Sequence, residues 1–591
     1  MRHHIIIPIL TISVSFSQTV PHHGSGTYLL IRRLNQLRAE GKSTALARTA
    51  AQYLSGRTFL SPNFAIHYTL APNVHRPRLT TADSSLRRRI DSILAVLPSS
   101  LTTFQRDSAV NGTFPDSVAP AFVVRAAYHF ERTRSYYGDS LGMLLPTGGS
   151  QSRVFSGSSY DGSRYTVDIC DISTAEPDEA GPIYGLTWPG PISTELENDF
   201  IYEASYNNSS GQSIGSPIQA IVNGRVLHDY AVDWDMAIKV TVAHEFSHAV
   251  HFTYIPDASN FHDWYELSAT AMEEILGPEV NDYFQYLPCI FQHPQTVPLF
   301  ADVDNGVCNA SPYFINPFFG QGIFAQYLYH FVNKRFDAVL WDKLRSNGNN
   351  LSTALAATTR SYGKSWDSVY SAYTALFATA GRSGSAASCT DSMAPIFTRD
   401  MPCWPVPVYD SVPTLSKSLY DTLSPLTFRL FKPPKAASVT RMDLSGLSNS
   451  IPQKVNRTGS TYNATALAGN PVSLFASSDS SVLCMTVPNS SFTQNGRAYL
   501  TTAPQGFVAF PNPANISEGQ VLFFAPSGST APITLTILSE SGRRVAELAL
   551  NSDQSSWTWD LKDQQARTVP PGVYYYRIPG KLPKSMLVLP R

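Results

Sequence analysis

Hydrophobic residues recur along the chain at two different spacings. From residue 27 to 54 the apolar positions lie three or four apart, which predicts an amphipathic helical pair. The stretch that follows, up to about residue 235, is mixed. Strands are predicted at Phe64–Tyr68 and Tyr165–Ile169, and a helix at Ser84–Leu97. The fold class expected from this mixture is α+β.

Two further changes of pattern divide the rest of the chain. Helical spacing dominates from Asp235 to about Gly381. Beyond Cys389 the sequence consists of short β-rich runs separated by Pro, Ser, Asn and Gly, which is typical of β-sandwich modules. We therefore expect one domain boundary near residue 390 and another between residues 495 and 505.

The amino terminus has the pattern of an export signal. Met1-Arg2 and two histidines precede about a dozen mainly apolar residues, and the small and polar pair Ser17-Gln18 follows. This pattern predicts a signal peptide over residues 1–18, too short to anchor the chain in a bilayer; the alternative is a buried first strand. No later stretch contains 18 uninterrupted apolar residues, so no transmembrane segment is expected in the mature chain.

Composition narrows the possible classes of protein. The 591 residues include 44 Lys and Arg against 45 Asp and Glu, a formal charge of −1, which argues against nucleic-acid binding. Charged residues are only 15% of the chain and hydrophobic residues 43%, so the chain has enough apolar residues to bury real cores. At this length two to four domains are expected.

Six cysteines fit an oxidising compartment. None lies in a C-x-x-C pair, which argues against a zinc ribbon or a thioredoxin-like site. Closeness in sequence favours the pairs Cys289 with Cys308 and Cys389 with Cys403. Cys170 and Cys484 then remain either free or joined over a long range.

The clearest chemical signal is the string His244-Glu245-Phe246-Ser247-His248. On a helix, positions i and i+4 lie on one face, so the two imidazoles can bind one Zn²⁺. Glu245 then lies close to the ion without binding it and can take a proton from metal-activated water. The longer pattern with glycine and a third histidine is absent, because His251 and Tyr254 occupy those positions; this disfavours a metzincin.

A catalytic zinc site needs a third protein ligand. We select Glu266, which begins a second helical stretch 18 residues after His248 and can reach the same ion from a helix packed against the first. His251 is an alternative ligand on the first helix, although a histidine there more often packs against a neighbour. Glu273, two turns beyond Glu266, either holds an imidazole N–H as an outer carboxylate or is merely solvated. An inert helix pair is the remaining alternative.

These strings resemble a known family. Residues Thr241–Val250, followed by Trp264-Tyr265-Glu266, resemble the gluzincin metallopeptidases, and most of all a family of secreted bacterial metalloproteases. Further similar strings are Phe64–Tyr68, Tyr165–Ile169, Tyr184–Thr187, Glu197–Phe200 and Phe318–Leu328, so the resemblance covers roughly residues 60–380.

The resemblance implies a zincin-like metalloprotease domain with Zn²⁺ bound by His244, His248 and Glu266, and with Glu245 as general base. Two residues depart from the family pattern: Leu267 replaces a glycine, and His251 replaces a glutamine. Neither change removes a ligand, but Leu267 bears on how closely the two helices approach. Tyr313, Tyr327 and His262 are available to stabilise an oxyanion, and nothing in their spacing selects one.

The last unit carries a second resemblance. The alternation in residues 533–538, the turn Ser541-Gly542 and the run 544–550 predict a hairpin in a small β-sandwich. The opening Pro511-Asn512-Pro513, the hairpin and the string Gly572–Ile578 resemble carboxyl-terminal sorting domains of the type IX secretion system and related immunoglobulin-like domains. The glycine that these domains usually carry near Ala566 is missing. The resemblance implies export across a Gram-negative outer membrane.

The expected organisation is a signal peptide (1–18), a helical amino-terminal layer or pro-segment (19–60), a zincin-like domain (61–390), a middle β-rich domain (391–500) and a carboxyl-terminal β-sandwich, immunoglobulin-like sorting domain (501–591). The expected function is that of a secreted or surface-attached zinc protease. Its partners would be a protein or peptide substrate and the outer-membrane secretion machinery. The alternative is an inactive zincin-fold protein for adhesion or binding at the cell surface. An aminopeptidase is a third option. It would need an anionic site for the substrate amine, and no glycine-and-acid string in the sequence indicates one.

Overall fold

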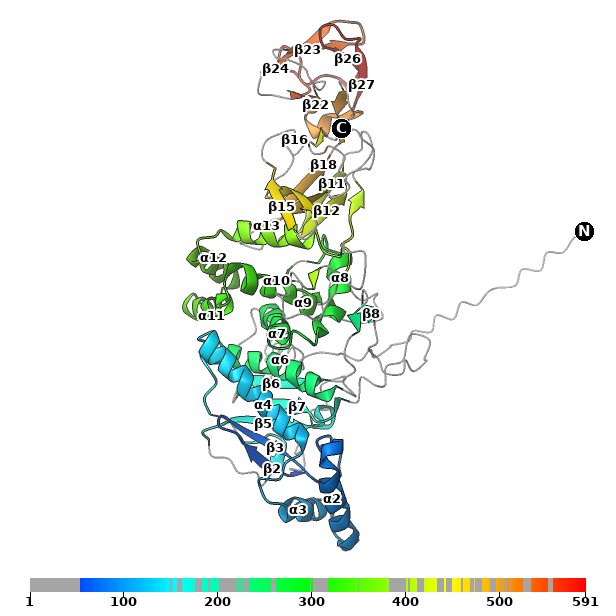
Figure 1. The fold of residues 1–591 in the computed structure, drawn as a ribbon. Coiled ribbons are helices and arrows are strands. Elements are labelled where there is room, and N and C mark those ends of the chain that lie inside the picture. Colours follow the sequence, from blue (N-terminus) through cyan, green and yellow to red (C-terminus); the bar gives the residue numbers. More distant parts are fainter. Residues whose placement is uncertain are drawn as a thin grey trace, which may run out of the picture.

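The computed structural model describes most of the helix-rich half and much of the β-rich half of the chain. The described residues are 54–148, 151–156, 162–175, 183–189, 192–200, 221–222, 225–226, 233–256, 262–297, 299–300, 317–348, 350–381, 400–401, 404–411, 419–432, 441–442, 449–458, 461–467, 472–473, 481–488, 496–500, 502–503, 508–510, 512–524, 533–550 and 556–590. Figure 1 shows that these parts follow one another in chain order along a long axis. Helices and several β-sheets together confirm the α+β class.

A five-stranded sheet forms the first layer, with the strand order β2-β3-β5-β7-β6. The three inner strands run parallel, and each edge strand is antiparallel to its neighbour. Every residue of β3 and β5 is buried, as expected for inner strands of a sheet covered on both faces. The strands are β2 (Arg57–Leu60), β3 (Phe64–Tyr68), β5 (Tyr165–Cys170), β6 (Gly185–Pro189) and β7 (Ile192–Glu197). Both predicted strands are thus confirmed.

Helices lie beside this sheet before and after it in sequence. The helix predicted at 84–97 is confirmed as α2 (Ser84–Val96). The ring of Phe246, in the long helix described below, lies 5.6 Å from Phe64 and 5.8 Å from Tyr165, so this helix packs on the sheet face. The other early elements are η1 (Thr81–Asp83), α3 (Thr103–Thr113), α4 (Ala121–Ser135), η2 (Tyr136–Ser140), α5 (Ile172–Ala175) and the short strands β1 (Leu54–Ser55), β4 (Phe155–Ser156), β8 (Ile221–Val222) and β9 (Arg225–Val226).

The region predicted to be helical is helical. Its longest element, α6 (Trp234–Tyr254), is buried over most of its length and contains no glycine or proline, so neither solvent nor sequence interrupts it. The other elements are α7 (His262–Leu276), η4 (Asp282–Tyr286), α8 (Leu287–Gln292), α9 (Pro317–Gly320), α10 (Gly322–Tyr327), η6 (Leu328–Val332), α11 (Phe336–Ser346), α12 (Leu351–Ser361) and α13 (Trp366–Phe377).

The middle β region packs directly against α13. One apolar core runs from the first sheet through the helices and includes Phe428, Val455 and Cys484 of this region. Its strands are β10 (Asp410–Ser411), β11 (Leu419–Leu423), β12 (Phe428–Lys432), β13 (Arg441–Met442), β14 (Ile451–Thr458), β15 (Thr461–Ala466), β16 (Val472–Ser473), β17 (Ser481–Thr486), β18 (Gly496–Leu500) and β19 (Thr502–Ala503). The change of sequence pattern near residue 390 therefore does not coincide with a break in the core.

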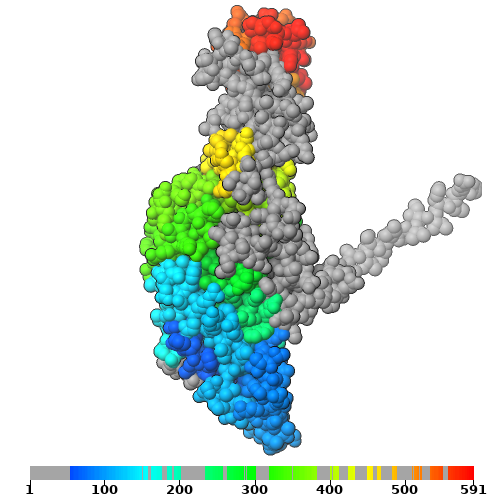
Figure 2. Space-filling model, in the orientation of Figure 1, coloured from blue at the N-terminus to red at the C-terminus, as the bar shows by residue number. Residues whose placement is uncertain are grey.

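The last unit has a core of its own, built around aromatic pairs such as Phe523 with Tyr576 and Trp559 with Tyr574. The predicted hairpin is confirmed, and Gly542 takes a φ of 77° in its turn. Figure 2 shows this unit in red at the end of the molecule opposite to the first helices. Its elements are β20 (Val508–Phe510), β21 (Ala514–Asn515), η9 (Ile516–Glu518), β22 (Val521–Phe524), β23 (Ile533–Ser539), β24 (Arg544–Leu550), β25 (Ser556–Trp559), β26 (Gly572–Arg577) and β27 (Lys584–Leu589).

The amino-terminal prediction is wrong for residues 54–60. These residues form strands instead of the end of a helical layer, because β2 pairs with β3 and buries the Arg57 side chain against carbonyl oxygens of Asn111 and Phe114. The signal peptide and the rest of the helical pair lie outside the described residues. Among the residues that are described, no helix is both long and apolar enough to cross a bilayer.

The cysteines are described only in part. Cys289 forms a disulfide, and Cys308, Cys389 and Cys403 lie outside the described residues, so both proposed pairings stay predictions. Cys170 and Cys484 are buried and form no disulfide, which decides between the two alternatives that the sequence left open for them.

Candidate metal centre

Two packed helices carry the candidate metal centre. His244, Glu245 and His248 come from α6, and Glu266 comes from α7. All four side chains are at most 5% exposed. At the start of α6, Asp235 accepts hydrogen bonds from Arg125 of α4 at 2.7 and 2.6 Å. The negative charge of Asp235 in the first turn also interacts favourably with the helix dipole. The helix that carries three of the residues is therefore fixed at its amino end.

The two imidazoles and the Glu266 carboxylate converge on one point. Nε2 of His244 lies 3.1 Å from Oε2 of Glu266, and Nε2 of His248 lies 3.5 Å from Oε1 of the same carboxylate. Potential ligand atoms of His244, Glu245 and His248 all lie within 4.8 Å of one another. Leu267 does not keep the helices apart, because Glu266, its neighbour, reaches both histidines.

The residues fit a zinc ion. Two ligands of Zn²⁺ at about 2.1 Å and the tetrahedral angle are about 3.4 Å apart, close to both separations from the Glu266 carboxylate. Oε1 of Glu266 is buried and accepts no hydrogen bond, which is costly for a carboxylate unless something else neutralises it. Two imidazoles and one carboxylate are also a common donor set of catalytic zinc.

The imidazoles and carboxylates of this centre also stabilise one another's charges. Burial alone would lower the pKa of His244, but the carboxylates of Glu266 and Glu273 outweigh it and raise that pKa well above its usual value. Burial would likewise raise the pKa of Glu266, yet the imidazoles of His248 and His244 lower it to about 2. The carboxylate of Glu266 is thus held in its ionised form, the form that binds metal.

Glu273 contacts His244, one of the candidate metal ligands. Its Oε1 lies 2.5 Å from Nδ1 of His244, the ring nitrogen that faces away from Glu266. Such a contact fixes the orientation of the ring and leaves Nε2 for an ion. Of the two alternatives for Glu273, the geometry agrees with an outer carboxylate rather than with a solvated side chain.

His251 does not join this group. Its ring stacks on Trp341 with centroids 4.5 Å apart, and its Nε2 lies 3.4 Å from the Ser268 hydroxyl and 3.9 Å from Asp337. Burial, followed by the neighbouring His248 and His244, lowers its pKa well below the usual value. His251 therefore packs as a neutral ring between helices, the alternative that the sequence favours.

A row of hydroxyl groups leads to Glu245. The Thr187 hydroxyl donates to Oε2 of Glu245 at 2.8 Å and lies 3.0 Å from the main-chain oxygen of the same residue. Thr194 lies 3.0 Å from Thr187, and the Tyr165 hydroxyl lies 2.9 Å from Thr194. If each hydroxyl donates to the next, the row runs from Tyr165 on β5 through Thr194 on β7 and Thr187 on β6 to the carboxylate. Burial raises the pKa of Tyr165, which keeps it a donor.

Gly185 lets strand β6 approach Glu245. A Cβ atom at this position would collide with the Cγ atom of Glu245 and lie 2.9 Å from a methyl carbon of Thr241. No motif in the sequence selects Gly185, Thr187 or Thr194 as functional residues. Gly185 and Thr187 lie in the string Tyr184–Thr187, but their approach to Glu245 depends on strand register, and Thr194 lies in no such string.

Of the three candidate oxyanion donors, only Tyr327 has a side chain in the described part of the chain. Tyr313 and the side chain of His262 lie outside the described part of the chain. Tyr327 is buried among the rings of Phe324, Phe331 and Tyr373.

Comparisons with known proteins add little to this geometry. No protein-family model matches the chain, and no curated protein matches it. A structure of PorZ, an essential bacterial surface component of the type IX secretion system of Porphyromonas gingivalis, is 22% identical over 14% of this chain, with a TM-score of 0.12; the chain spans 11% of the length of PorZ. The adhesin domain of Epf from Streptococcus pyogenes is 11% identical over 29% of this chain and 77% of that domain, with a TM-score of 0.13. Scores this low carry no argument about the fold.

Proposed function

We propose that the protein is a secreted zinc-dependent protease of the gluzincin type. The observation that carries the proposal is the convergence of His244, His248 and a buried oxygen of Glu266 that accepts no hydrogen bond, with Glu245 beside them. His244, His248 and Glu266 would hold the zinc. A zinc ion bound there would polarise a peptide carbonyl and lower the pKa of water.

The chain's own residues have distinct roles in this proposal. Glu245 accepts the proton of the attacking water and later passes it to the leaving amine. Thr187 holds Oε2 of that carboxylate by donating a hydrogen bond to it, so that the carboxylate keeps one orientation. Glu273 holds the His244 ring through Nδ1. The edge strand β6 runs beside the site, and its backbone can pair with an extended peptide.

The finer domain assignments belong to the same proposal. Residues 61–390 would form a zincin-like domain, and the modules at 391–500 and 501–591 would be immunoglobulin-like β-sandwiches. The last module would serve as an address for the type IX secretion machinery, which places the protein at the surface of a Gram-negative bacterium or outside it. The separate core of the last unit and the sorting-domain strings in its sequence support this assignment.

Metal analysis combined with casein hydrolysis tests the function. We expect one zinc per chain, hydrolysis by the wild type, and loss of hydrolysis with a chelator. Glu245→Gln should keep the zinc and lose about 100-fold or more in rate, because the base is removed and the ligands remain. Glu266→Gln should lose zinc. Glu540→Gln, an exposed glutamate of the last unit, is the matched control and should change neither quantity.

Each other result has a defined meaning. Absence of zinc from the wild type would contradict the metal centre. Zinc with equal hydrolysis by wild type and Glu245→Gln would contradict the role of the base. Zinc without hydrolysis of casein or of a mixed peptide library would favour the inactive surface protein.

A further inference from the structure

A second hollow lies at the carboxyl ends of the parallel strands. It has a volume of about 430 Å³ and is separate from the metal centre, whose residues do not line it. Residues 73–79 follow β3, Asp171 follows β5, and Glu197 ends β7, so three neighbouring strands end at its wall. Ligands of open α/β sheets bind characteristically at this edge, where the strands leave their last side chains and backbone groups.

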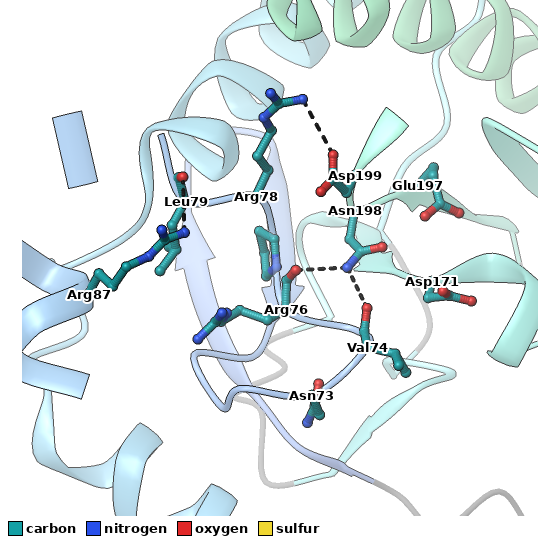
Figure 3. Close-up of a pocket in the computed structure, with 11 residues that line it drawn as sticks. Asn73, Val74, Arg76, Arg78, Leu79, Arg87, Asp171, Glu197, Asn198 and Asp199 are labelled. Carbon is teal, nitrogen blue, oxygen red and sulfur yellow. Dashed lines mark hydrogen bonds and ion pairs between the residues drawn. The ribbon is translucent and has the colours of Figure 1, made fainter. Parts of the chain in front are cut away.

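One side of the pocket carries two arginines, Arg76 and Arg87, that form no ion pair with the described residues. Among the described residues, the Arg76 guanidinium forms no hydrogen bond and no ion pair. Arg87 reaches only the main-chain oxygen of Leu79, at 3.5 Å. By contrast, Arg78 is paired with Asp199 at 3.5 Å. Figure 3 shows Arg76 and Arg87 on one side of the pocket and Asp171 and Glu197 on the other.

The two unpaired guanidiniums act on each other. Burial lowers the pKa of Arg76, and the charge of Arg87 lowers it further; Asp91 opposes this only in part. Two like charges that approach each other in a half-buried wall repel, and a bound anion would remove this repulsion. The planar fork of an arginine suits the oxygens of a carboxylate or a phosphate.

The opposite side offers a buried polar atom that has no partner. Glu197 is 3% exposed; its Oε2 accepts a hydrogen bond from the Ile172 amide at 3.1 Å, and its Oε1 has no hydrogen bond. Burial raises the pKa of Glu197 well above its usual value. This shift favours the neutral form of the carboxyl group, and a neutral carboxyl group can both donate and accept a hydrogen bond.

A cation is a poor occupant of this pocket. Among the described residues, the acids of the pocket do not form a group whose oxygens converge closely enough to hold a metal ion; the group that does is at the metal centre. The pocket also contains three arginines. The ligand must therefore satisfy unpaired positive charge on one side and the buried Oε1 of Glu197, which has no hydrogen bond, on the other.

We propose that this pocket binds a small organic anion that carries a carboxylate or a phosphate group at Arg76 and Arg87 and a hydroxyl or amide group at Glu197. A volume of about 430 Å³ accommodates a metabolite-sized molecule and is within the range of small-molecule sites. The proposal does not depend on the proposed protease activity, because it uses none of the residues of the metal centre.

Calorimetric titration of the full-length chain tests the proposal with four probes: inorganic phosphate, glycerol 3-phosphate, acetate and malate. Saturable binding is expected for the phosphates or for the carboxylates, with a Kd of about 1 mM or tighter, and the class that binds identifies the acidic group. The hydroxyl-bearing probe of that class should bind better than its simple partner. Glu197→Ala should remove this preference.

Arginine variants decide whether the binding occurs in this pocket. Arg76→Gln and Arg87→Gln should each weaken it about 10-fold or more. Arg88→Gln, an exposed neighbour on α2 that does not line the pocket, should leave it unchanged. Arg87 is itself exposed, so its replacement tests the pocket even if Arg76→Gln fails to fold. Equal binding by Arg87→Gln and Arg88→Gln, or no saturable binding of any probe up to about 10 mM, would overturn the proposal.

Discussion

Glu245 is positioned by a residue whose own side chain has no acid–base chemistry near neutral pH. The Thr187 hydroxyl donates to Oε2 of the Glu245 carboxylate at 2.8 Å, and a hydrogen bond to a charged group contributes about 1.5–3 kcal/mol. Thr187→Val keeps the shape and removes the donor. We expect kcat for casein or a peptide substrate to fall about 10-fold or more, with zinc content and KM little changed.

The control for this prediction is Thr187→Ser, which keeps the hydroxyl and should retain most of the activity. If valine and serine at this position give the same kcat, the hydrogen bond does not position the base.

Gly185 allows a test by added volume instead of lost polarity. Gly185→Ala places a Cβ where Glu245 Cγ now lies, so either β6 or the carboxylate must shift. We expect hydrolysis to fall while zinc remains bound. Gly112→Ala is the matched change, because no atom lies within 4 Å of its added Cβ. An unchanged rate in Gly185→Ala would show that the strand can move without consequence.

At the scale of residues, the sequence selected the side chains that converge at the candidate metal centre and not those that hold them in place. His244 and His248 are separated by one helical turn, a relation that spacing alone expresses. Glu266 and Glu273 follow on the next helix. The contact of Thr187 with Glu245 joins residues 58 positions apart and depends on the register of β6 against β7 and on the packing of α6 upon them. No single-sequence pattern records these.

At the scale of elements, the long and strongly periodic segments were the predictable ones. Strands β3 and β5 and helix α2 lie where the spacing predicts them. The failure concerns residues 54–60, where a short pair of strands follows a helix-like pattern. Arg57 looks like a surface residue in the sequence, but its guanidinium finds carbonyl oxygens of Asn111 and Phe114, at the end of α3, inside the fold. Tertiary contacts outweigh local preference in such short elements.

Three helices meet at one partly buried acid, whose side chain is 22% exposed. Asp337 of α11 accepts hydrogen bonds at 3.1 Å from the indole N–H groups of Trp264 on α7 and Trp341 on α11, and Trp341 stacks on His251 of α6. Burial raises the pKa of Asp337 to about 7, although the two indole N–H groups oppose the rise. The folded protein therefore retains a proton that the unfolded chain releases above pH 4.

This proton gives the stability of the fold a pH dependence with a defined sign. The contribution of Asp337 to the free energy of unfolding is present below about pH 4 and is lost as the pH rises to about 7. Asp337→Asn does not titrate. The free energy of unfolding of the wild type, relative to that of the variant, should therefore fall by at least about 1.4 kcal/mol, one pKa unit, between pH 4.5 and 7.5. Urea unfolding at both pH values measures it; a constant difference would contradict the assignment.

At the scale of the whole molecule, the first sheet, the helices and the middle β region share one large core, so the described residues do not form one core for each change of sequence pattern. Residues of α13 share hydrogen bonds with the middle β region: Tyr370 donates to the Leu426 carbonyl, and Thr374 and Thr486 are 2.6 Å apart. The last unit keeps its apolar residues to itself. The sequence pattern changes near residue 390 because helices give way to strands there. This change of secondary structure does not indicate which faces are buried together.

Two truncations distinguish these boundaries. A chain that ends at residue 505 should stay soluble and keep the main unfolding transition of the parent, because the first core is complete. A chain that ends at residue 390 should aggregate or unfold at least about 10 °C lower, because it exposes the apolar face of α13. Differential scanning calorimetry compares them. Equal transition temperatures for the two truncated chains would show that the middle β region is dispensable.

The shared core also limits how such a protein can be rebuilt by recombination. An exchange of gene segments at residue 390 would separate Thr374 from Thr486 and Ser371 from Gln453, leaving two complementary faces without their partners. An exchange after residue 505 would leave both the shared core and the core of the last unit undivided in the described part of the chain and carry the last unit to a new host. The helical half and the middle sheet are therefore expected to be inherited together, whereas the last unit is free to be traded.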